Sequence, residues 1–168
     1  IFEAHSPKVI HHLAAVNGTR RFHKEADLVV DVNINGTRNA LQLAKKHGCR
    51  MIFYSSPESF GEQESMPLSN DSESLFPPAH IHQRHSYGAS KHIGELLCQF
   101  EVRNGLDVRI ARPCNAYGPR LHGDDNGQVV SMMMAADPIV VHGDGSQTRC
   151  LTWVGDVIDG LLKLTDMD

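Results

Sequence analysis

Tyr87 and Lys91 are a phenol and an ammonium four residues apart, within the segment 87–91 of sequence YGASK. Side chains at this spacing lie on the same face of a helix. An ammonium near a phenol favours the phenolate and would lower the phenol pKa from its usual value of about 10. Such a phenol can act as a general acid and base. The same spacing also occurs on ordinary solvated helix faces. The surrounding sequence is therefore needed to distinguish a reactive pair from such a face.

Two serines end the strand that is predicted before this pair. Residues 50–55 form a short apolar run that ends in Ser55 and continues into Ser56. Ligands bind at the carboxyl ends of the strands in a parallel sheet. A hydroxyl at this position would contact both a substrate oxygen and the phenol of Tyr87. The residue types therefore favour a reaction centre at this edge of the sheet.

Amide and guanidinium groups follow the next predicted strand, at residues 108–112. This strand brings Arg112, Asn115 and Arg120 to the same edge of the sheet. Arg149, which ends a glycine-rich turn, adds a planar guanidinium that suits a pyrophosphate. These groups predict an anionic, phosphate-bearing ligand beside Tyr87.

The elements that would position these residues alternate between strands and helices. Apolar residues at helical spacing predict helices, and short apolar runs bounded by turn residues predict strands. Strands are expected at 8–15, 50–55 and 108–112, and helices at 30–47, 87–103 and around 157–162. Strand and helix in alternation predict an α/β fold with a parallel sheet and right-handed crossovers.

Composition narrows the class of protein and the partners. The 168 residues are 40% hydrophobic and 21% charged, which fits one soluble globular domain. The formal net charge is −4 and no segment concentrates basic residues, so we expect no nucleic acid partner. No run approaches the roughly 20 apolar residues that span a bilayer, so we expect no membrane contact. The four cysteines are widely separated and form no Cys-x-x-Cys pair, which favours a reduced, cytoplasmic setting.

Taken together, the chain resembles the extended short-chain dehydrogenase/reductase family, which contains nucleotide-sugar 4-epimerases, 4,6-dehydratases and UDP-glucuronate decarboxylases. Six segments carry the resemblance in the right order: 9–15 (VIHHLAA), 33–37 (NINGT), 54–61 (YSSPESFG), 87–95 (YGASKHIGE), 112–120 (RPCNAYGPR) and 142–149 (HGDGSQTR). Motifs in a matching context are far more specific than single motifs. The resemblance implies a Rossmann-like doubly wound parallel sheet, part of a small C-terminal substrate-binding region, and NAD as the cofactor.

The resemblance also implies roles for four catalytic residues. Tyr87 would take the proton of the sugar 4-hydroxyl while a hydride leaves C4 for NAD⁺. Lys91 would hold the nicotinamide ribose and adjust the pKa of Tyr87, and Ser56 would be the hydroxyl partner. Glu58 matches the carboxylate that lies near the sugar carboxylate in decarboxylases.

Binding residues are carried over in the same way. The implied cofactor-binding residues are Leu13, Ala14, Ala15, Asn33, Ser55, Tyr87, Lys91 and Pro113. The implied substrate-binding residues are Arg84, Asn115, Arg120, Val130 and Arg149. Without the family, Asn33 would be interpreted as a helix cap or kink and Asn115 as a loop turn. No metal site is expected: the spaced histidines His80, His82 and His85 fit a solvated loop, and a metal-dependent hydrolase is the weaker alternative.

One substitution in the segment after Ser56 reduces the number of reactions that are expected. Dehydratases of the family carry an Asp-Glu pair after the hydroxyl residue, but here Pro57 occupies the Asp position and cannot transfer a proton. Decarboxylation or 4-epimerisation of a UDP-sugar is therefore expected, with similar weight for each. The family also implies a homodimer that forms through helices including the one that carries Tyr87.

Two features of the family are missing from these residues. A glycine-rich turn after the first strand and an acidic residue for the adenosine ribose do not occur. We therefore expect an N-terminally truncated piece, with 1–118 as a partial NAD-binding domain and 119–168 as part of the substrate-binding region. The strand near residue 9 would then expose a sheet edge, and the piece alone would fold poorly and bind NAD weakly or not at all. The alternative is a non-catalytic remnant or partner-binding module of the same fold.

Overall fold

The computed structural model describes residues 2–64, 66–81, 83–123, 127–141 and 143–167. Its elements are α1 (Phe2–His5), β1 (Val9–His12), α2 (Thr19–Lys24), α3 (Ala26–His47), β2 (Arg50–Tyr54), the 3-10 helix η1 (Pro57–Phe60), α4 (Ser86–Arg103), β3 (Val108–Ala111), β4 (Ala116–Tyr117), α5 (Val129–Ala135), β5 (Thr152–Trp153) and α6 (Val154–Asp166). The three predicted strands and the three longer predicted helices are confirmed, and their ends shift by a few residues.

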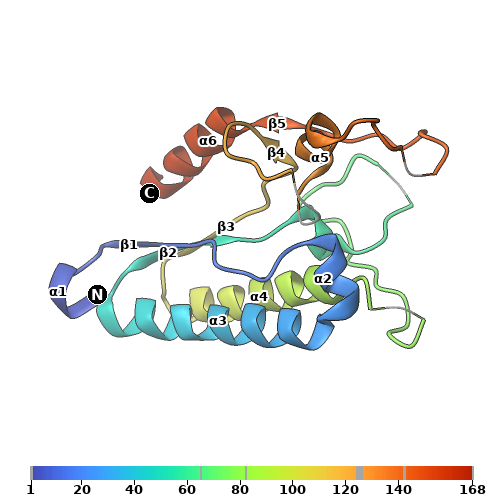
Figure 1. Ribbon diagram of the computed structural model, residues 1–168. Coiled ribbons are helices and arrows are strands. Elements are labelled where there is room, and N and C mark those ends of the chain that lie inside the picture. The colour runs from blue at the N-terminus through green and yellow to red at the C-terminus, as the bar shows by residue number, and fades with distance from the viewer. Residues whose placement is uncertain (1, 65, 82, 124–126, 142, 168) are drawn as a thin grey trace.

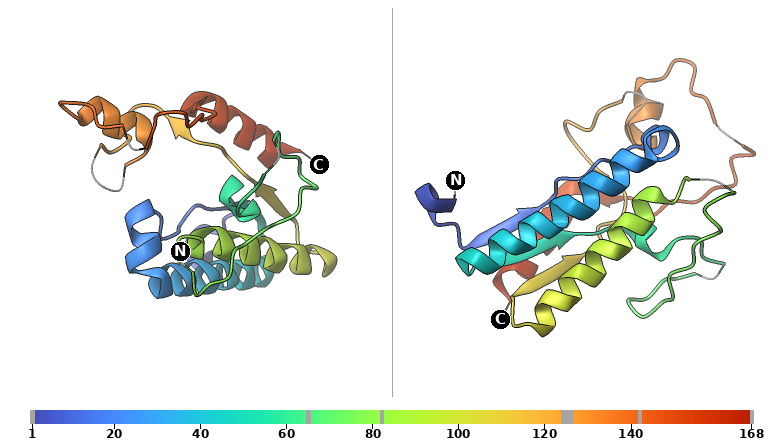
Figure 2. Two further views of the ribbon diagram at one scale, coloured as in Figure 1. Left: turned by 90° about the vertical axis from the view of Figure 1, so that its right-hand side faces the viewer. Right: turned by 90° about the horizontal axis from the view of Figure 1, so that it is seen from below.

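Three strands form a parallel sheet in the order β1-β2-β3. Ile10 lies opposite Met51, and Met51 lies opposite Val108. Helices α3 and α4 lie side by side on one face of the sheet, and α6 lies on the other side (Figures 1 and 2). Parallel strands joined through helices on the sheet faces are the arrangement of Rossmann-like folds, so the predicted fold class is confirmed. Within the described residues β1 pairs only with β2, so it forms an edge of the sheet as expected.

Helix α3 is longer than its apolar pattern predicts. It begins at Ala26, four residues before the expected start at Val30. No glycine or proline interrupts these four residues, and Asp27 in the first turn suits the positive end of a helix. The helix ends as predicted, because Gly48 adopts the left-handed conformation with a φ of 65°.

The core lies between the sheet and the two helices on its face. Its buried members are Leu41 and Ala44 on α3, Cys49, Met51 and Phe53 on or beside β2, and Cys98 on α4. A Cβ added at Gly94 of α4 would lie 2.5 Å from the Phe53 ring, so only glycine lets this helix approach β2 so closely. The close approach brings the first turns of α4 to the end of β2, where Ser55 and Ser56 follow.

Helix α4 turns small and polar residues inward and much of its apolar stripe outward. The buried residues of this helix are Gly88, Ser90, Lys91, Gly94, Glu95 and Cys98. By contrast, Ile93, Leu96 and Phe100 are 39%, 58% and 62% exposed. An apolar stripe at helical spacing usually faces the core. Here the inward face of the helix is taken by the groups that could do chemistry.

A second, two-stranded parallel sheet joins β4 and β5, with Ala116 opposite Thr152. The predicted division of the chain after residue 118 stays a prediction, and β4 and β5 pair across it. Among the helices of the described residues, none combines the length and the apolar character that crossing a bilayer would require.

Two arginines attach α6 to the parallel sheet. Arg109 on β3 donates from Nη1 to the carbonyl oxygen of Leu164 over 3.0 Å, and Arg50 on β2 donates from Nη1 to that of Thr165 over 2.5 Å. Asp107 pairs with both guanidinium groups, at 2.5 Å from Arg50 and 3.2 Å from Arg109. Cations near the last carbonyls of a helix satisfy acceptors that have no partner within the helix. The end of α6 is thereby fixed beside the sheet.

Candidate active site

Tyr87 and Lys91 lie in the first turns of α4 and face the carboxyl end of β2. The Lys91 ammonium is 5.6 Å from the centre of the Tyr87 ring and donates to the carbonyl oxygen of Tyr54 over 2.6 Å. Phe22 of α2 stacks on the Tyr87 ring with 4.8 Å between the ring centroids. Lys91 is only 4% exposed, so the ammonium is held inside the protein beside the phenol.

The pKa of Tyr87 departs from the sequence-based expectation. Burial, and to a smaller extent the negative charge of Glu58, raise this pKa to about 12, although a hydrogen bond with Ser56 acts in the opposite direction. The predicted lowering of this pKa is therefore wrong for this structure. The reason is that the hydration lost on burial and the Glu58 carboxylate together outweigh the groups that favour the phenolate.

The pKa of Lys91 is also shifted by its surroundings. Burial lowers it to about 8, although the negative charges that Cys98 and Glu95 can carry act in the opposite direction. The Lys91 charge in turn contributes to lowering the pKa of His12 on β1, after burial as the larger cause. Lys91 is thus an ammonium whose charged form is penalised by its site.

Ser56 and Glu58 meet the start of α4 through η1. The Ser56 hydroxyl accepts the backbone N–H of Glu58 over 3.2 Å and so caps η1. A Cβ at Gly88 would lie 2.2 Å from the carbonyl oxygen of Glu58, so glycine is required where η1 contacts α4. The structure therefore brings together the four residues expected to be catalytic: Ser56, Glu58, Tyr87 and Lys91.

Asn33 joins three segments around this group. Its Oδ1 accepts the backbone N–H of Val16 over 2.7 Å, and its Nδ2 donates to the Val16 carbonyl oxygen over 3.2 Å and to the Ser90 hydroxyl over 3.0 Å. Asn33 lies in the middle of α3 and is 3% exposed, so it is neither a cap nor a surface residue. It holds the loop after β1 against the helix that carries Lys91.

The other residues expected at the cofactor occupy the ends of three neighbouring strands. Leu13, Ala14 and Ala15 follow β1 directly, and Pro113 follows β3. Ser55 follows β2, but its buried hydroxyl donates to the Glu95 carboxylate on α4. The Ser55 hydroxyl is thus engaged by Glu95 within the protein.

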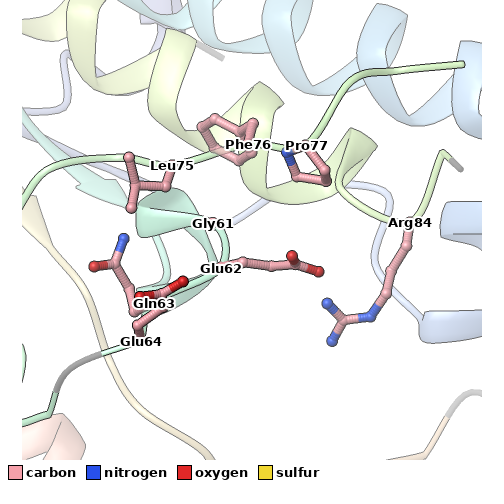
Figure 3. Close-up of a pocket in the computed structure, with 8 residues that line it drawn as sticks. All are labelled: Gly61, Glu62, Gln63, Glu64, Leu75, Phe76, Pro77 and Arg84. Atoms are coloured by element: carbon pink, nitrogen blue, oxygen red, sulfur yellow. The ribbon is translucent and has the colours of Figure 1, made fainter. Parts of the chain in front are cut away.

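Arg84 lines a cavity of about 650 Å³ beside the end of η1 (Figure 3). The wall also carries Gly61, Glu62, Gln63, Glu64, Leu75, Phe76 and Pro77. In Figure 3 the Arg84 guanidinium and the Glu62 carboxylate extend toward one another. The two glutamates add negative charge to the wall that carries Arg84. Tyr87 and Lys91 do not line this cavity.

The remaining residues expected at the substrate lie in the C-terminal part, mostly at the surface. Asn115 donates from Nδ2 to the carbonyl oxygen of Cys150 over 3.4 Å. Arg149 is exposed and donates to groups of its own turn, the Thr148 carbonyl oxygen and the Gln147 Oε1, over 2.7 and 2.8 Å. Arg120 is exposed beyond β4, and Val130 is half-buried on α5. No hydrogen bond or ion pair recorded for the described residues joins these four to Tyr87 or Lys91.

Arg112 was expected to offer its guanidinium to a ligand, and this is wrong. It binds the Glu95 carboxylate with two hydrogen bonds, 2.8 Å from Nε and 2.5 Å from Nη2. Its third contact is to Asn70 Oδ1 over 3.1 Å. Sequence reasoning missed Glu95 altogether, because the two partners lie 17 residues apart on different elements.

The histidines of the 80–85 segment do not form a metal site among the described residues. His82 lies outside the described residues, and His80 is exposed. His85 is buried, lies 3.1 Å from the Glu62 carboxylate, and precedes α4 at its N-cap position. The interpretation as a fully solvated loop is therefore wrong for His85.

Comparison with known proteins gives a consistent result. The model of the NAD dependent epimerase/dehydratase family matches residues 1–168. UDP-N-acetyl-alpha-D-glucosaminuronate decarboxylase of Bacillus cytotoxicus is 35% identical over 162 residues, which cover 94% of this chain and 50% of that protein. The chain thus spans about half the length of this curated relative.

Solved structures with the same fold also cover nearly the whole chain. UDP-glucose 4-epimerase from Thermotoga maritima, solved with UDP-glucose, has a TM-score of 0.87 at 26% identity and covers 98% of this chain and 54% of its own. A dTDP-glucose 4,6-dehydratase from Streptomyces venezuelae, solved with NAD bound, has a TM-score of 0.79 at 27% identity over 92% of this chain and 47% of its own. With a family match along its full length and this arrangement of Ser56, Tyr87 and Lys91, the chain belongs to the NAD-dependent epimerase/dehydratase family.

Proposed function

We propose that this chain is part of an enzyme that oxidises C4 of a nucleotide-linked sugar by passing a hydride to NAD⁺. The 4-keto intermediate is then decarboxylated, or presented by its other face, and the hydride returns to C4 with a proton on the oxygen. One observation carries the proposal: the phenol of Tyr87 is hydrogen-bonded to Ser56, and the centre of its ring lies 5.6 Å from the buried Lys91 ammonium. The group lies at the carboxyl ends of parallel strands, where this fold binds ligands.

Tyr87 is the residue that would move the proton of the sugar 4-hydroxyl. With a pKa of about 12, it starts as a neutral phenol at physiological pH. The Ser56 hydrogen bond favours the phenolate, whereas burial and the Glu58 carboxylate oppose it. Burial is the larger cause of the raised pKa, so contacts of a bound substrate and cofactor with the phenol would have to offset the lost hydration before Tyr87 acts as a base.

The residues around Lys91 fit the nicotinamide ribose of NAD. Within the described residues this buried ammonium has one hydrogen-bond acceptor, the Tyr54 carbonyl, so two of its three N–H groups are left for ribose hydroxyls. Asn33 holds the neighbouring loop at Val16 in place through two hydrogen bonds. Bound NAD⁺ would supply the hydride acceptor for the oxidation at C4.

Decarboxylation is supported by Glu58 and by the relatives. The curated relative from Bacillus cytotoxicus is a decarboxylase of a UDP-linked uronic acid. Glu58 lies near enough to Tyr87 to raise its pKa, which supports the proposal that its carboxylate lies beside the reacting sugar. A 4-keto uronic acid is a β-keto acid and loses carbon dioxide readily, so oxidation at C4 supplies most of the activation.

Epimerisation at C4 is the second candidate. It is supported by the UDP-glucose 4-epimerase structure, which superposes on 98% of this chain. Both reactions need the same oxidation at C4. Dehydration needs a second acid after Ser56, and Pro57 at that position cannot provide one.

Incubation of the full-length protein with NAD⁺ and a panel of UDP-, dTDP- and GDP-sugars tests the proposal. Decarboxylation would release carbon dioxide from a UDP-linked uronic acid and leave a pentose, and epimerisation would give the 4-epimer without loss of mass. Both products are distinguished by mass spectrometry and NMR. A purified full-length protein that holds NAD and leaves every sugar unchanged would refute the catalytic proposal and favour the non-catalytic alternative.

We also propose that the full-length protein is a homodimer through α3 and α4. Leu28, Val32 and Leu43 on α3 are 43%, 38% and 39% exposed. The outward stripe of α4 adds Leu96 and Phe100, which are 58% and 62% exposed. Several large apolar side chains exposed on two neighbouring helices are consistent with an interface. Leu96→Glu is expected to convert the dimer to a monomer in light scattering, and an unchanged mass would contradict this interface.

The cytoplasm is the proposed location of the protein. All four cysteines are free, at positions 49, 98, 114 and 150. Free thiols at the surface, as at 114 and 150, are typical of a reducing compartment.

A further inference from the structure

Glu95 is a buried carboxylate on α4, one helical turn beyond Lys91. It is 7% exposed and accepts hydrogen bonds from three donors. The Ser55 hydroxyl and the Arg112 Nε both donate to Oε1, the latter over 2.8 Å, and the Arg112 Nη2 donates to Oε2 over 2.5 Å. Burial alone would raise the pKa of Glu95, but the hydrogen bonds from Arg112 and Ser55 lower it overall. The side chain is therefore an anion inside the protein.

The donors to Glu95 come from segments that converge on the candidate active site. Ser55 lies between Tyr54, whose carbonyl oxygen accepts the Lys91 ammonium, and Ser56, which bonds to the phenol of Tyr87. Arg112 directly follows β3, and its guanidinium lies 4.7 Å above the ring of Phe60 at the end of η1. One carboxylate thus holds the end of β2 and the end of η1 against α4.

We propose that Glu95 is a positioning residue that sets where Ser56 and the Tyr54 carbonyl lie relative to Tyr87 and Lys91. The inference rests on the proposed function, because the positions that Glu95 fixes are those of the acid–base group. Stability alone explains such a pair poorly, since apolar residues in place of a buried ion pair are often equally stable. Bidentate, charge-assisted hydrogen bonds instead fix distance and direction.

Glu95 also acts on Lys91 through its charge. Its negative charge raises the pKa of Lys91 and so opposes the effect of burial. Neutralising Glu95 should therefore lower the pKa of Lys91 further. The titratable groups around Lys91 and the adjacent phenol are His12 on β1, Tyr54 on β2, Glu58 on η1, and Tyr87, Glu95 and Cys98 on α4 itself; Arg112 faces Glu95 from beyond β3.

Three substitutions in the full-length holoenzyme separate the geometry from the charge. Glu95→Gln keeps the shape and removes the charge, Ser55→Ala removes one hydrogen bond and keeps the charge, and Glu101→Gln is the control. Glu101 lies on the same helix and pairs with Lys45 over 3.0 Å at the surface. We would measure kcat and KM against pH, and the titration of Lys91 by NMR with Lys91→Met for assignment.

Glu95→Gln is expected to lower kcat about 10- to 100-fold with little change in KM, because small displacements of catalytic groups have effects of this size. The alkaline limb of the kcat profile and the Lys91 titration should both move to lower pH, by at least about 0.5 pH unit. Ser55→Ala should lower kcat less and leave both titrations in place, and Glu101→Gln should match the wild type.

The proposal is overturned if kcat of Glu95→Gln stays within twofold of the wild type, or if its Lys91 titration is unmoved, since a purely structural role would not shift that titration. If Glu95→Gln does not fold, Arg112→Lys and Ser55→Ala decide, and wild-type kcat in both overturns the proposal. The Lys91 titration needs no turnover. An inactive wild type would therefore refute the proposed function separately, while the titration still tests Glu95.

Discussion

The two halves of the candidate site are built differently. Around Tyr87, the side chains of Asn33, Lys91 and Glu95 are 3%, 4% and 7% exposed, and each is held by hydrogen bonds to other elements. In the C-terminal part, Arg149 is exposed and bonds only within its own turn among the described contacts. The first half is fixed by the packing of α4 on the sheet, whereas the second offers side chains that a ligand would have to order.

This difference suggests a division of labour. Acid–base chemistry needs groups held at fixed distances, and a helix packed on a sheet provides such positions. Recognition of a particular sugar nucleotide can be left to surface segments that adjust when the ligand binds. Substitutions in the buried half should therefore change kcat and stability, and substitutions in the exposed half should change mainly KM.

Removing the phenol oxygen is expected to have the largest effect. Tyr87→Phe in the full-length protein keeps the stacking on Phe22 but removes the group that moves the proton. We expect kcat to fall about 10³-fold with NAD binding retained, as for the loss of a general acid–base residue. The control is Tyr117→Phe, which removes a hydroxyl from the exposed half and should leave kcat unchanged. Turnover within tenfold of the wild type would contradict the role of Tyr87.

Lys91 is expected to be required for turnover and, at neutral pH, to lower the free energy of unfolding. Its folded-state pKa of about 8 lies below the usual 10.5. Its contribution to stability is therefore present above pH 10.5 and lost as pH falls through 8, a difference of about 3 kcal/mol. Lys91→Met should abolish turnover yet raise the free energy of unfolding at pH 7 by up to about 3 kcal/mol. The gain should vanish near pH 10.5.

Urea unfolding of the full-length protein without ligands, at several pH values, measures this effect. Lys45→Met on α3 is the matched control, because the Lys45 side chain is 57% exposed. Its stability should not depend on pH in the same way. A Lys91→Met variant that is less stable than the wild type at pH 7 would show that the hydrogen bond to Tyr54 outweighs the burial of the charge.

The sequence predicted the long elements well and the short ones poorly. The strands at residues 50–54 and 108–111 and the helices α3 and α4 have apolar patterns that arise from local periodicity. The short elements η1, β4 and β5 contain only 2 to 4 residues and depend on partners far along the chain, as in the pairing of Ala116 with Thr152. Helix α2 was also missed, since six residues carry no clear period.

The site shows the same limit in its electrostatics. Spacing alone predicted that Tyr87 and Lys91 share a helix face. The direction of the Tyr87 pKa depends on burial and on Glu58, which reaches the phenol because Gly88 lets η1 approach α4. Likewise, nothing local to Arg112 indicates that its guanidinium turns inward to Glu95. Both of these failed predictions concern side chains whose surroundings are set by tertiary contacts.

Asn33 tests how far the rigidity of the buried half depends on one amide. Asn33→Ala removes three hydrogen bonds and leaves the backbone N–H and C=O of Val16 without this partner. We expect a loss of about 2 kcal/mol in the free energy of unfolding, measured in urea, and faster hydrogen exchange in residues 13–18. Asn35→Ala is the control, because Asn35 is exposed and bonds to the exposed Asp31 within the same helix. Equal stability of the two variants would contradict this role.

Substitution of Arg149 is expected to have the smallest effect of these variants. It also tests the difference between the two halves most directly. Its guanidinium is exposed, so Arg149→Ala should leave the unfolding midpoint unchanged. If it binds the phosphates of the sugar nucleotide, KM should rise about 10-fold while kcat stays within twofold, because lost ground-state binding appears in KM. Arg103→Ala at the end of α4 removes an equivalent surface charge and should change neither value. A fall in kcat with unchanged KM would instead assign Arg149 to the acid–base group. It would contradict the proposal that the buried half performs the chemistry and the exposed half binds the substrate.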